Sequence, residues 1–101
     1  MRFSHATALV LQAVLDGRHY GFDIMDATGL PSGTVYPILR RLEAEACLRS
    51  RWEKDGQARK EQRPPRRYYE LTAGGSRIAR DMVSRATASG AATLRPATSE
   101  R

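Results

Sequence analysis

The sequence predicts one small, mainly α-helical domain with a single β-hairpin. Apolar residues recur at helical spacing in four segments, and two short segments with alternating character and aromatic side chains separate the third from the fourth. Glycine or proline stands between most of these segments. A chain of 101 residues supplies one hydrophobic core and leaves too little for a second domain.

The first helix is predicted over residues 3–15, which are apolar on nearly every side. Ser4 is its candidate N-cap, and Gly17 suits the left-handed conformation that ends many helices. A helix with this composition needs neighbours all round it. We therefore expect other elements, or a second copy of the chain, to cover it.

A shorter helix is predicted over residues 21–28 and stopped by Gly29. A third helix is predicted from about residues 32–34 to Cys47, with Ser32 as its candidate N-cap. Pro37 lies near its start, where the missing backbone N–H costs least.

Residues 48–52 and 67–71 are predicted to form an antiparallel hairpin. The connection over residues 53–66 is longer than most hairpin loops, so it is expected to be either a binding loop or partly disordered. Trp52, Tyr68 and Tyr69 are expected to form the hydrophobic face of the hairpin against the core, with stacking on bases as the alternative.

A fourth helix is predicted to follow Thr72, which caps it. The glycine pair at residues 74 and 75 is expected to permit close packing of this helix. Residues 90–101 resemble a disordered tail.

Charge and composition narrow the function classes. The chain carries 17 Lys and Arg against 11 Asp and Glu, and a net charge of +6 favours a polyanionic partner if it is concentrated on one face. One cysteine and two histidines make neither an internal disulfide nor a zinc cluster, so no metal and no cofactor are expected. The sequence lacks a membrane-spanning apolar run and the pattern of a secretory signal, which predicts a cytoplasmic protein without a membrane partner.

Three helices followed by a hairpin, with a glycine-containing turn before the third helix, is the layout of a winged helix-turn-helix. The major groove of DNA admits one helix, which needs an apolar inner face and a polar or basic outer face. The third helix has both, and its candidate DNA-binding residues are Ser32, Thr34, Tyr36, Arg40 and Arg41. Adjacent residues diverge on a helix, so one arginine is expected to reach DNA and the other to lie near the core rim. The alternative is a solvated face, or pairing with Glu43 or Glu45.

The hairpin tip holds much of the positive charge, with an excess of three over its acidic residues. Such a loop beside a reading helix fits contact with phosphates or the minor groove, although a polar loop without a partner remains the alternative. Its candidate DNA-binding residues are Lys54, Arg59, Lys60, Arg63, Arg66 and Arg67.

Four segments together resemble the signature of PadR-like transcriptional regulators: residues 32–43 (SGTVYPILRRLE), 20–22 (YGF), 49–53 (RSRWE), and 66–72 (RRYYELT) leading to Gly75. The resemblance implies a homodimeric regulator, usually a repressor, that dimerises through its C-terminal helix. This chain has Ala46-Cys47 where the family usually has glycine and an aliphatic residue, so the third helix is expected to end less sharply. The C-terminal region is short, and a small-molecule effector is not indicated.

The apolar first helix gives a separate argument for a dimer, in which the fourth helix packs on the first helix of a partner. The candidate interface residues are Leu11, Val14, Ile78, Met82 and Ala86, and the alternative is that the fourth helix folds back on its own subunit. The predicted organisation is a winged helix-turn-helix over residues 1–71, a dimerisation helix over 72–89 and the tail over 90–101.

The sequence therefore predicts a homodimeric, sequence-specific double-stranded DNA-binding repressor that reads a pseudo-palindromic operator. A winged-helix adaptor for a protein partner, without specific DNA binding, is the alternative. An enzyme is not expected, since no nucleophile and base lie at a recognisable spacing and no phosphate-binding glycine loop is present. Cys47 is expected to be a buried apolar residue.

Overall fold

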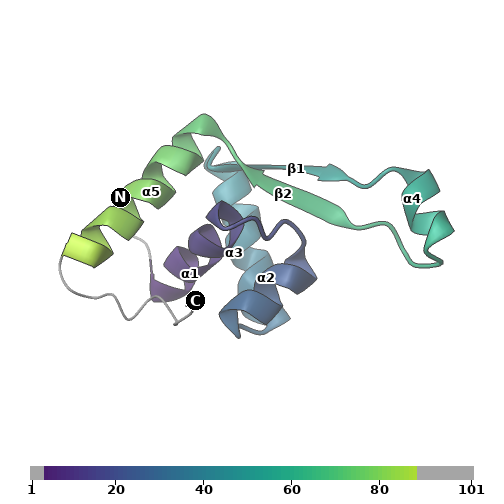
Figure 1. Ribbon diagram of the computed structural model, residues 1–101, viewed down its shortest axis with the longest axis horizontal. Coiled ribbons are helices and arrows are strands. Elements are labelled where there is room, and N and C mark those ends of the chain that lie inside the picture. The colour runs from purple at the N-terminus through teal and green to yellow at the C-terminus, as the bar shows by residue number, and fades with distance from the viewer. Residues whose placement is uncertain (1–3, 89–101) are drawn as a thin grey trace.

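The computed structural model describes residues 4–88, with the backbone alone described for Asp55 and residues 86–88. The elements are α1 (His5–Leu15), α2 (Gly21–Thr28), α3 (Ser32–Ala44), β1 (Leu48–Trp52), α4 (Asp55–Lys60), β2 (Arg67–Leu71) and α5 (Ala73–Ala88). Figure 1 shows α1, α2 and α3 gathered beside the hairpin, with α5 at one end of the molecule and α4 at the other. The predicted tail and the side chain of Ala86 lie outside the described part.

The core forms around α1, which contacts α2, α3, α5 and β2. Val10 and Leu11 are completely buried, as are Ile24 and Leu39 from the next two helices. The cover that α1 needs therefore comes from its own chain, and α5 packs on the α1 of the same subunit. Leu11 and Val14, expected at a dimer interface, are instead core residues of the single chain, with 0% and 3% of their surface exposed.

The helix ends follow local chemistry. The Ser4 side chain accepts a hydrogen bond from the Thr7 N–H, which confirms the predicted cap of α1. Gly17 and Gly29 take the positive φ angles, 99° and 76°, that glycine adopts without strain. The residue that caps α3 is Pro31 rather than Ser32, which is the first residue of the helix, and no side chain caps this end.

The end of α3 is sharper than expected. The helix stops at Ala44, and Ala46 takes a φ of 62° although it is not glycine. The Cys47 N–H then donates to the Leu42 carbonyl at 2.8 Å, and the Ala46 N–H donates to that of Glu43 at 3.0 Å. These two bonds satisfy carbonyls that the helix leaves open, so the turn forms with alanine in the place of glycine.

The two predicted strands pair in antiparallel register from Leu48 opposite Leu71 to Trp52 opposite Arg67. The loop before α2 adds a bridge on the other edge of β2, where Tyr20 pairs with Tyr68. The tip, expected to be a loop, contains the short helix α4, which buries Ala58. We call residues 48–71 the wing.

Thr72 and Gly75 attach α5 to the rest of the fold. The Thr72 hydroxyl donates to the Ala46 carbonyl at 2.7 Å and accepts from the Gly75 N–H at 3.0 Å, which confirms the predicted cap. A methyl group added at Gly75 would overlap the backbone carbonyl of Cys47, whereas one at Gly74 would meet only the Thr72 hydroxyl at 3.9 Å. The close packing expected of the glycine pair therefore depends on Gly75.

Gly75→Ala is expected to lower the free energy of unfolding by about 3 kcal/mol, because two backbone segments must separate to admit the methyl group. Gly74→Ala is the matched control in the same turn, and it should raise stability by roughly 0.5 kcal/mol because alanine favours helices. Urea unfolding of the three proteins measures both values. Equal effects of the two substitutions would contradict this account of the junction.

Candidate nucleic-acid interface

The inner face of α3 holds the helix in the core and leaves its outer face free. Val35, Leu39 and Leu42 are completely buried. The predicted residues Ser32, Tyr36, Arg40 and Arg41 are exposed, and Thr34 is half-buried. Gly33 and Pro37 are also exposed on this helix. The prediction omitted them because neither carries a polar side chain.

The two arginines of α3 diverge as expected. The Arg41 Nη2 donates to the hydroxyl of the buried Thr7 at 3.2 Å, so this side chain lies against the rim of the core. Arg40 is exposed, and neither Glu43 nor Glu45 forms an ion pair with it. Glu43 instead accepts a hydrogen bond from Ser50 on β1 at 2.6 Å. Arg40 is therefore the arginine of α3 that is free to meet a partner.

The amino end of α3 differs from those of α1 and α5, because no side chain caps it. The Thr34 and Val35 N–H groups bond to the Pro31 carbonyl, and those of Ser32 and Gly33 precede the first helical bond. Both residues are exposed, and no acidic residue stands in the first turn. Open N–H groups at the positive end of a helix dipole form an anion-binding position.

The amino end of α2 lies close beside α3. A methyl group at Gly21 would overlap the ring and hydroxyl of Tyr36, so glycine allows the tyrosine to lie across the start of α2. Tyr36 keeps 38% of its surface exposed. The start of α2 is therefore in contact with the second turn of α3.

A buried carboxylate organises the wing. Glu53 is only 4% exposed, and it accepts hydrogen bonds from Arg63 Nη1 and Nη2 at 2.6 and 2.7 Å. The Arg66 N–H donates to it at 3.1 Å and the Tyr68 hydroxyl at 3.2 Å. The hydrogen bonds from Arg63, above all, lower the pKa of Glu53 to about 2. The carboxylate thus stays charged, and its hydrogen bonds connect the end of β1 to Arg63 and Arg66, where the chain returns toward β2.

The network continues to the loop before α2. The Tyr20 hydroxyl donates to that of Tyr68 at 3.4 Å, and their ring centroids are 4.8 Å apart. The hydrogen bond with Tyr20 is the largest cause, and burial the second, that raises the pKa of Tyr68 to about 12. The Arg66 guanidinium lies 4.5 Å from the centroid of the Tyr20 ring. The wing is therefore connected to the helix-turn-helix through aromatic and charged contacts.

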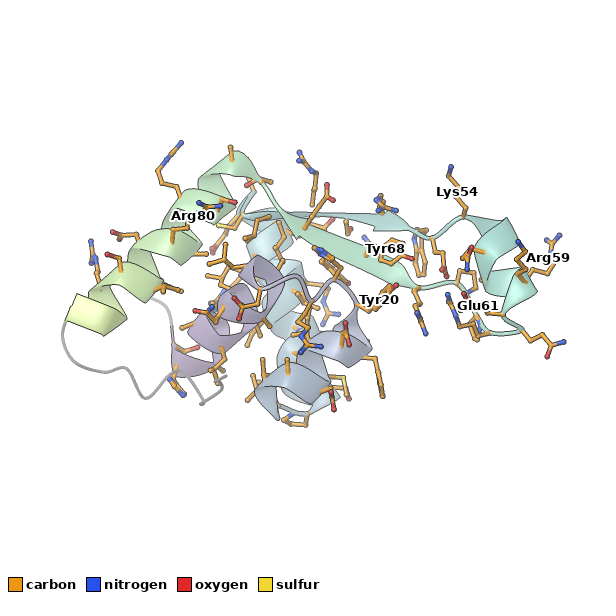
Figure 2. The ribbon with its side chains drawn as sticks, in the orientation of Figure 1. Tyr20, Lys54, Arg59, Glu61, Tyr68 and Arg80 are labelled. Atoms are coloured by element: carbon orange, nitrogen blue, oxygen red, sulfur yellow. The ribbon has the colours of Figure 1, made fainter. Side chains whose placement is uncertain are left out.

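Of the six cations predicted to bind DNA from the wing, three contact other residues of the protein and three do not form an ion pair with any described side chain. Arg63, predicted to contact DNA, forms ion pairs with Glu53 and Glu61, and its side chain is only 17% exposed. Its role in the structure is to hold the tip together. Arg67 donates to the Ser50 hydroxyl at 2.8 Å and approaches Glu43 at 3.7 Å, and Arg66 stacks on Tyr20. Lys54, Arg59 and Lys60 are exposed, without an ion pair to any side chain that the structure describes. Figure 2 shows Lys54 and Arg59 at the end of the wing, away from the helical cluster.

The three aromatic residues of the hairpin differ in burial. Tyr69 is 6% exposed and lies in the core, as predicted. Tyr68 is half-buried on the opposite face, beside Tyr20, so its predicted place against the core is wrong because adjacent strand residues face opposite ways. Trp52 has 60% of its surface exposed, so its predicted place against the core is wrong. The reason is position: Trp52 ends β1, where the strand has passed beyond the helices.

The order of elements, the exposed face of α3 and the cationic hairpin define a winged helix-turn-helix, a class of DNA-binding protein. A family model of PadR-like transcriptional regulators matches residues 10–81. The chain therefore belongs to the PadR-like family, whose members are regulators of transcription rather than enzymes. No curated protein sequence matches the chain closely enough to count as a relative.

Solved structures agree with this assignment. A PadR family regulator from Clostridium difficile has a TM-score of 0.73 at 18% identity, covering 90% of this chain and 97% of that one. One from Eggerthella lenta gives 0.62 at 27% identity, covering 86% and 80%. BpsR from Bordetella bronchiseptica, whose DNA binding is regulated by 6-hydroxynicotinic acid, gives 0.71 at 23% identity, covering 95% and 68%. The matches below 25% identity show a shared fold. No helix within residues 4–88 is long and apolar enough to cross a membrane.

Glu53→Gln is expected to destabilise the protein at pH 7 and to lose this effect in acid. A carboxylate whose pKa falls from 4.5 to about 2 on folding stabilises the folded state fully above pH 4.5 and loses that contribution as the pH falls through 2. Urea midpoints of wild type and variant should therefore differ at pH 7 and converge between pH 4.5 and 2. Glu70→Gln, which alters an exposed cross-strand pair with Arg49, is the control and should change little. A difference that persists unchanged at pH 2 would contradict the assigned charge.

Proposed function

We propose that this chain is a homodimeric repressor that binds a specific double-stranded DNA operator. The observation that carries the proposal is the uncapped, exposed amino end of α3, with the exposed Arg40 about two turns further along a helix anchored in the core. A helix of this kind fits the major groove with its first turn toward base edges and phosphates.

The roles of the α3 side chains follow from their exposure. The Ser32 hydroxyl and the first-turn N–H groups would bind a phosphate, and Thr34 and Tyr36 would contact the adjoining backbone or bases. Arg40 can offer two donors to the O6 and N7 atoms of a guanine. Arg41 supports these contacts by tying α3 to Thr7.

The wing adds contacts that depend less on sequence. Lys54, Arg59 and Lys60 project from the tip and would bind phosphates beside the major groove, releasing condensed counterions. Arg66 and Arg67 also keep exposed surface, and they would contact the backbone where the strands meet the tip. Arg63 holds the tip in place.

A dimer would double these contacts on a pseudo-palindrome whose half-sites lie about 34 to 36 Å apart. Members of this family typically form dimers, and a repressor role is typical of them. The half-buried Ile78 and Met82 of α5, with Leu9 of α1, are the candidate apolar contacts to a partner copy. Because Leu11 and Val14 are core residues, the proposed interface uses the outer sides of these two helices.

Arg40→Ala is expected to weaken binding to a selected duplex about tenfold more than binding to random DNA, because a bidentate base contact is worth roughly 1–3 kcal/mol. Lys60→Ala should weaken both duplexes alike and reduce the dependence of log affinity on log salt by about two, one for each subunit of the dimer. The duplex is first selected from a random pool, and anisotropy titrations at several salt concentrations give the affinities.

Recovery of a palindrome, with a light-scattering mass twice that of one chain, would support the dimer. Wild-type protein that retains no duplex in dilute buffer would contradict DNA binding and leave a protein-interaction adaptor as the function.

A further inference from the structure

Trp52 is a large apolar side chain without a place in the core. It ends β1, 60% of its surface is exposed, and it is the only tryptophan of the chain. The Arg67 guanidinium lies 5.3 Å from the indole centroid and supports the ring by a cation–π contact. The result is a ring fixed on one side and open on the other.

The side of the hairpin that carries this ring is the one facing α3. Residues alternate along a strand, so Trp52 shares its face with Ser50, whose hydroxyl binds Glu43 of α3. Arg67 shares this face, and it also lines a pocket of about 120 Å³ with Tyr36 and Tyr69 between the wing and the helices. Trp52 therefore lies on the α3 side of the hairpin, next to Arg67 but outside the residues that line this pocket.

The charges around the ring favour one kind of partner. Arg67 lies on the indole, and the exposed Lys54 follows two residues later. The guanidinium groups of Arg51 and Arg66 lie instead over the rings of Tyr68 and Tyr20. An apolar ring among cations suits a polyanion with apolar edges, which describes the deoxyriboses and base edges of a duplex groove.

Phe22 is more exposed, at 77%, and is another aromatic ring that could take this role. It lines the 120 Å³ pocket beside Arg67 and also borders a larger one, of about 390 Å³, with Met25, Leu30 and Pro31. Asp23 and Asp26 belong to the same helix, and Asp26 lines that pocket. These carboxylates would repel phosphates, so Trp52 is the better candidate for a contact with DNA.

We propose that the Trp52 ring, supported by Arg67, packs against deoxyribose and base edges in the minor groove beside the major groove that α3 enters. This inference rests on the proposed DNA-binding function and adds an apolar contact that supplements the phosphate contacts of the wing tip.

The single tryptophan makes the proposal directly measurable. A duplex selected by the wild-type protein and labelled at one end is titrated while its anisotropy and the tryptophan emission are both recorded. The emission should change with the same midpoint as the anisotropy, and acrylamide quenching of Trp52 should fall at saturation. Trp52→Ala should weaken binding about tenfold, since a stacked or packed base contact is worth roughly 1–3 kcal/mol.

Trp52→Phe is the matched variant, because it keeps an aromatic ring for Arg67, and it should bind within about threefold of wild type. Thermal unfolding of both variants checks that the hairpin still forms. Two results would overturn this inference and leave the proposed function standing. One is wild-type protein that binds the duplex without a change in tryptophan emission or quenching, and the other is Trp52→Ala protein that binds with wild-type affinity. Wild-type protein that gives no anisotropy change would instead remove the proposed function itself.

Discussion

Glu53 leaves the end of β1 with its carboxylate turned into the protein, where four donors from Arg63, Arg66 and Tyr68 close on it. A buried charge is tolerated only when it is paired and hydrogen-bonded, and removing one partner leaves the other uncompensated. The path of the chain from β1 through α4 to β2 is therefore constrained at both ends. The tip becomes a fixed extension of the sheet, and Tyr20 connects it to the helix-turn-helix.

This constraint decides which cations of the wing are available to a partner. Arg63 neutralises Glu53, and Arg67 connects Ser50 to Glu43, so part of the positive charge is used to hold the wing on α3. Lys54, Arg59 and Lys60 remain, presented by a tip whose shape is already set. A preformed surface loses less conformational freedom on binding than a flexible loop would. The wing is thus a positioned cationic surface at a fixed place relative to the outer face of α3.

Much of the fold could be predicted from the sequence, because the apolar period of each helix and the glycines at positions 17 and 29 are local signals. The two strands were predicted with the bounds observed. The helix α4 was missed because Ala58 alone is buried among its described side chains, and because it includes Gly56. The Glu53–Arg63 pair could not be predicted, since the two residues are ten positions apart in a segment with several other possible partners.

The candidate site was only partly predictable for similar reasons. Residue types identified the exposed polar face of α3, but the free amino end depends on Pro31, rather than Ser32, taking the cap position. The exposure of Trp52 depends on how far the hairpin extends beyond the helices, which alternation along the strand does not specify. Likewise, the cover of α1 by α5 of the same chain depends on the close approach of Gly75 to Cys47.

The proposed function requires the amino end of α3 and the wing to meet the same duplex. Amide hydrogen exchange, measured residue by residue with and without a saturating selected duplex, tests it most directly. Exchange at Ser32 and Gly33 and across residues 52–67 should be slower when DNA is bound. Exchange at Ser32 and Gly33 that is unchanged in the saturated complex would contradict it.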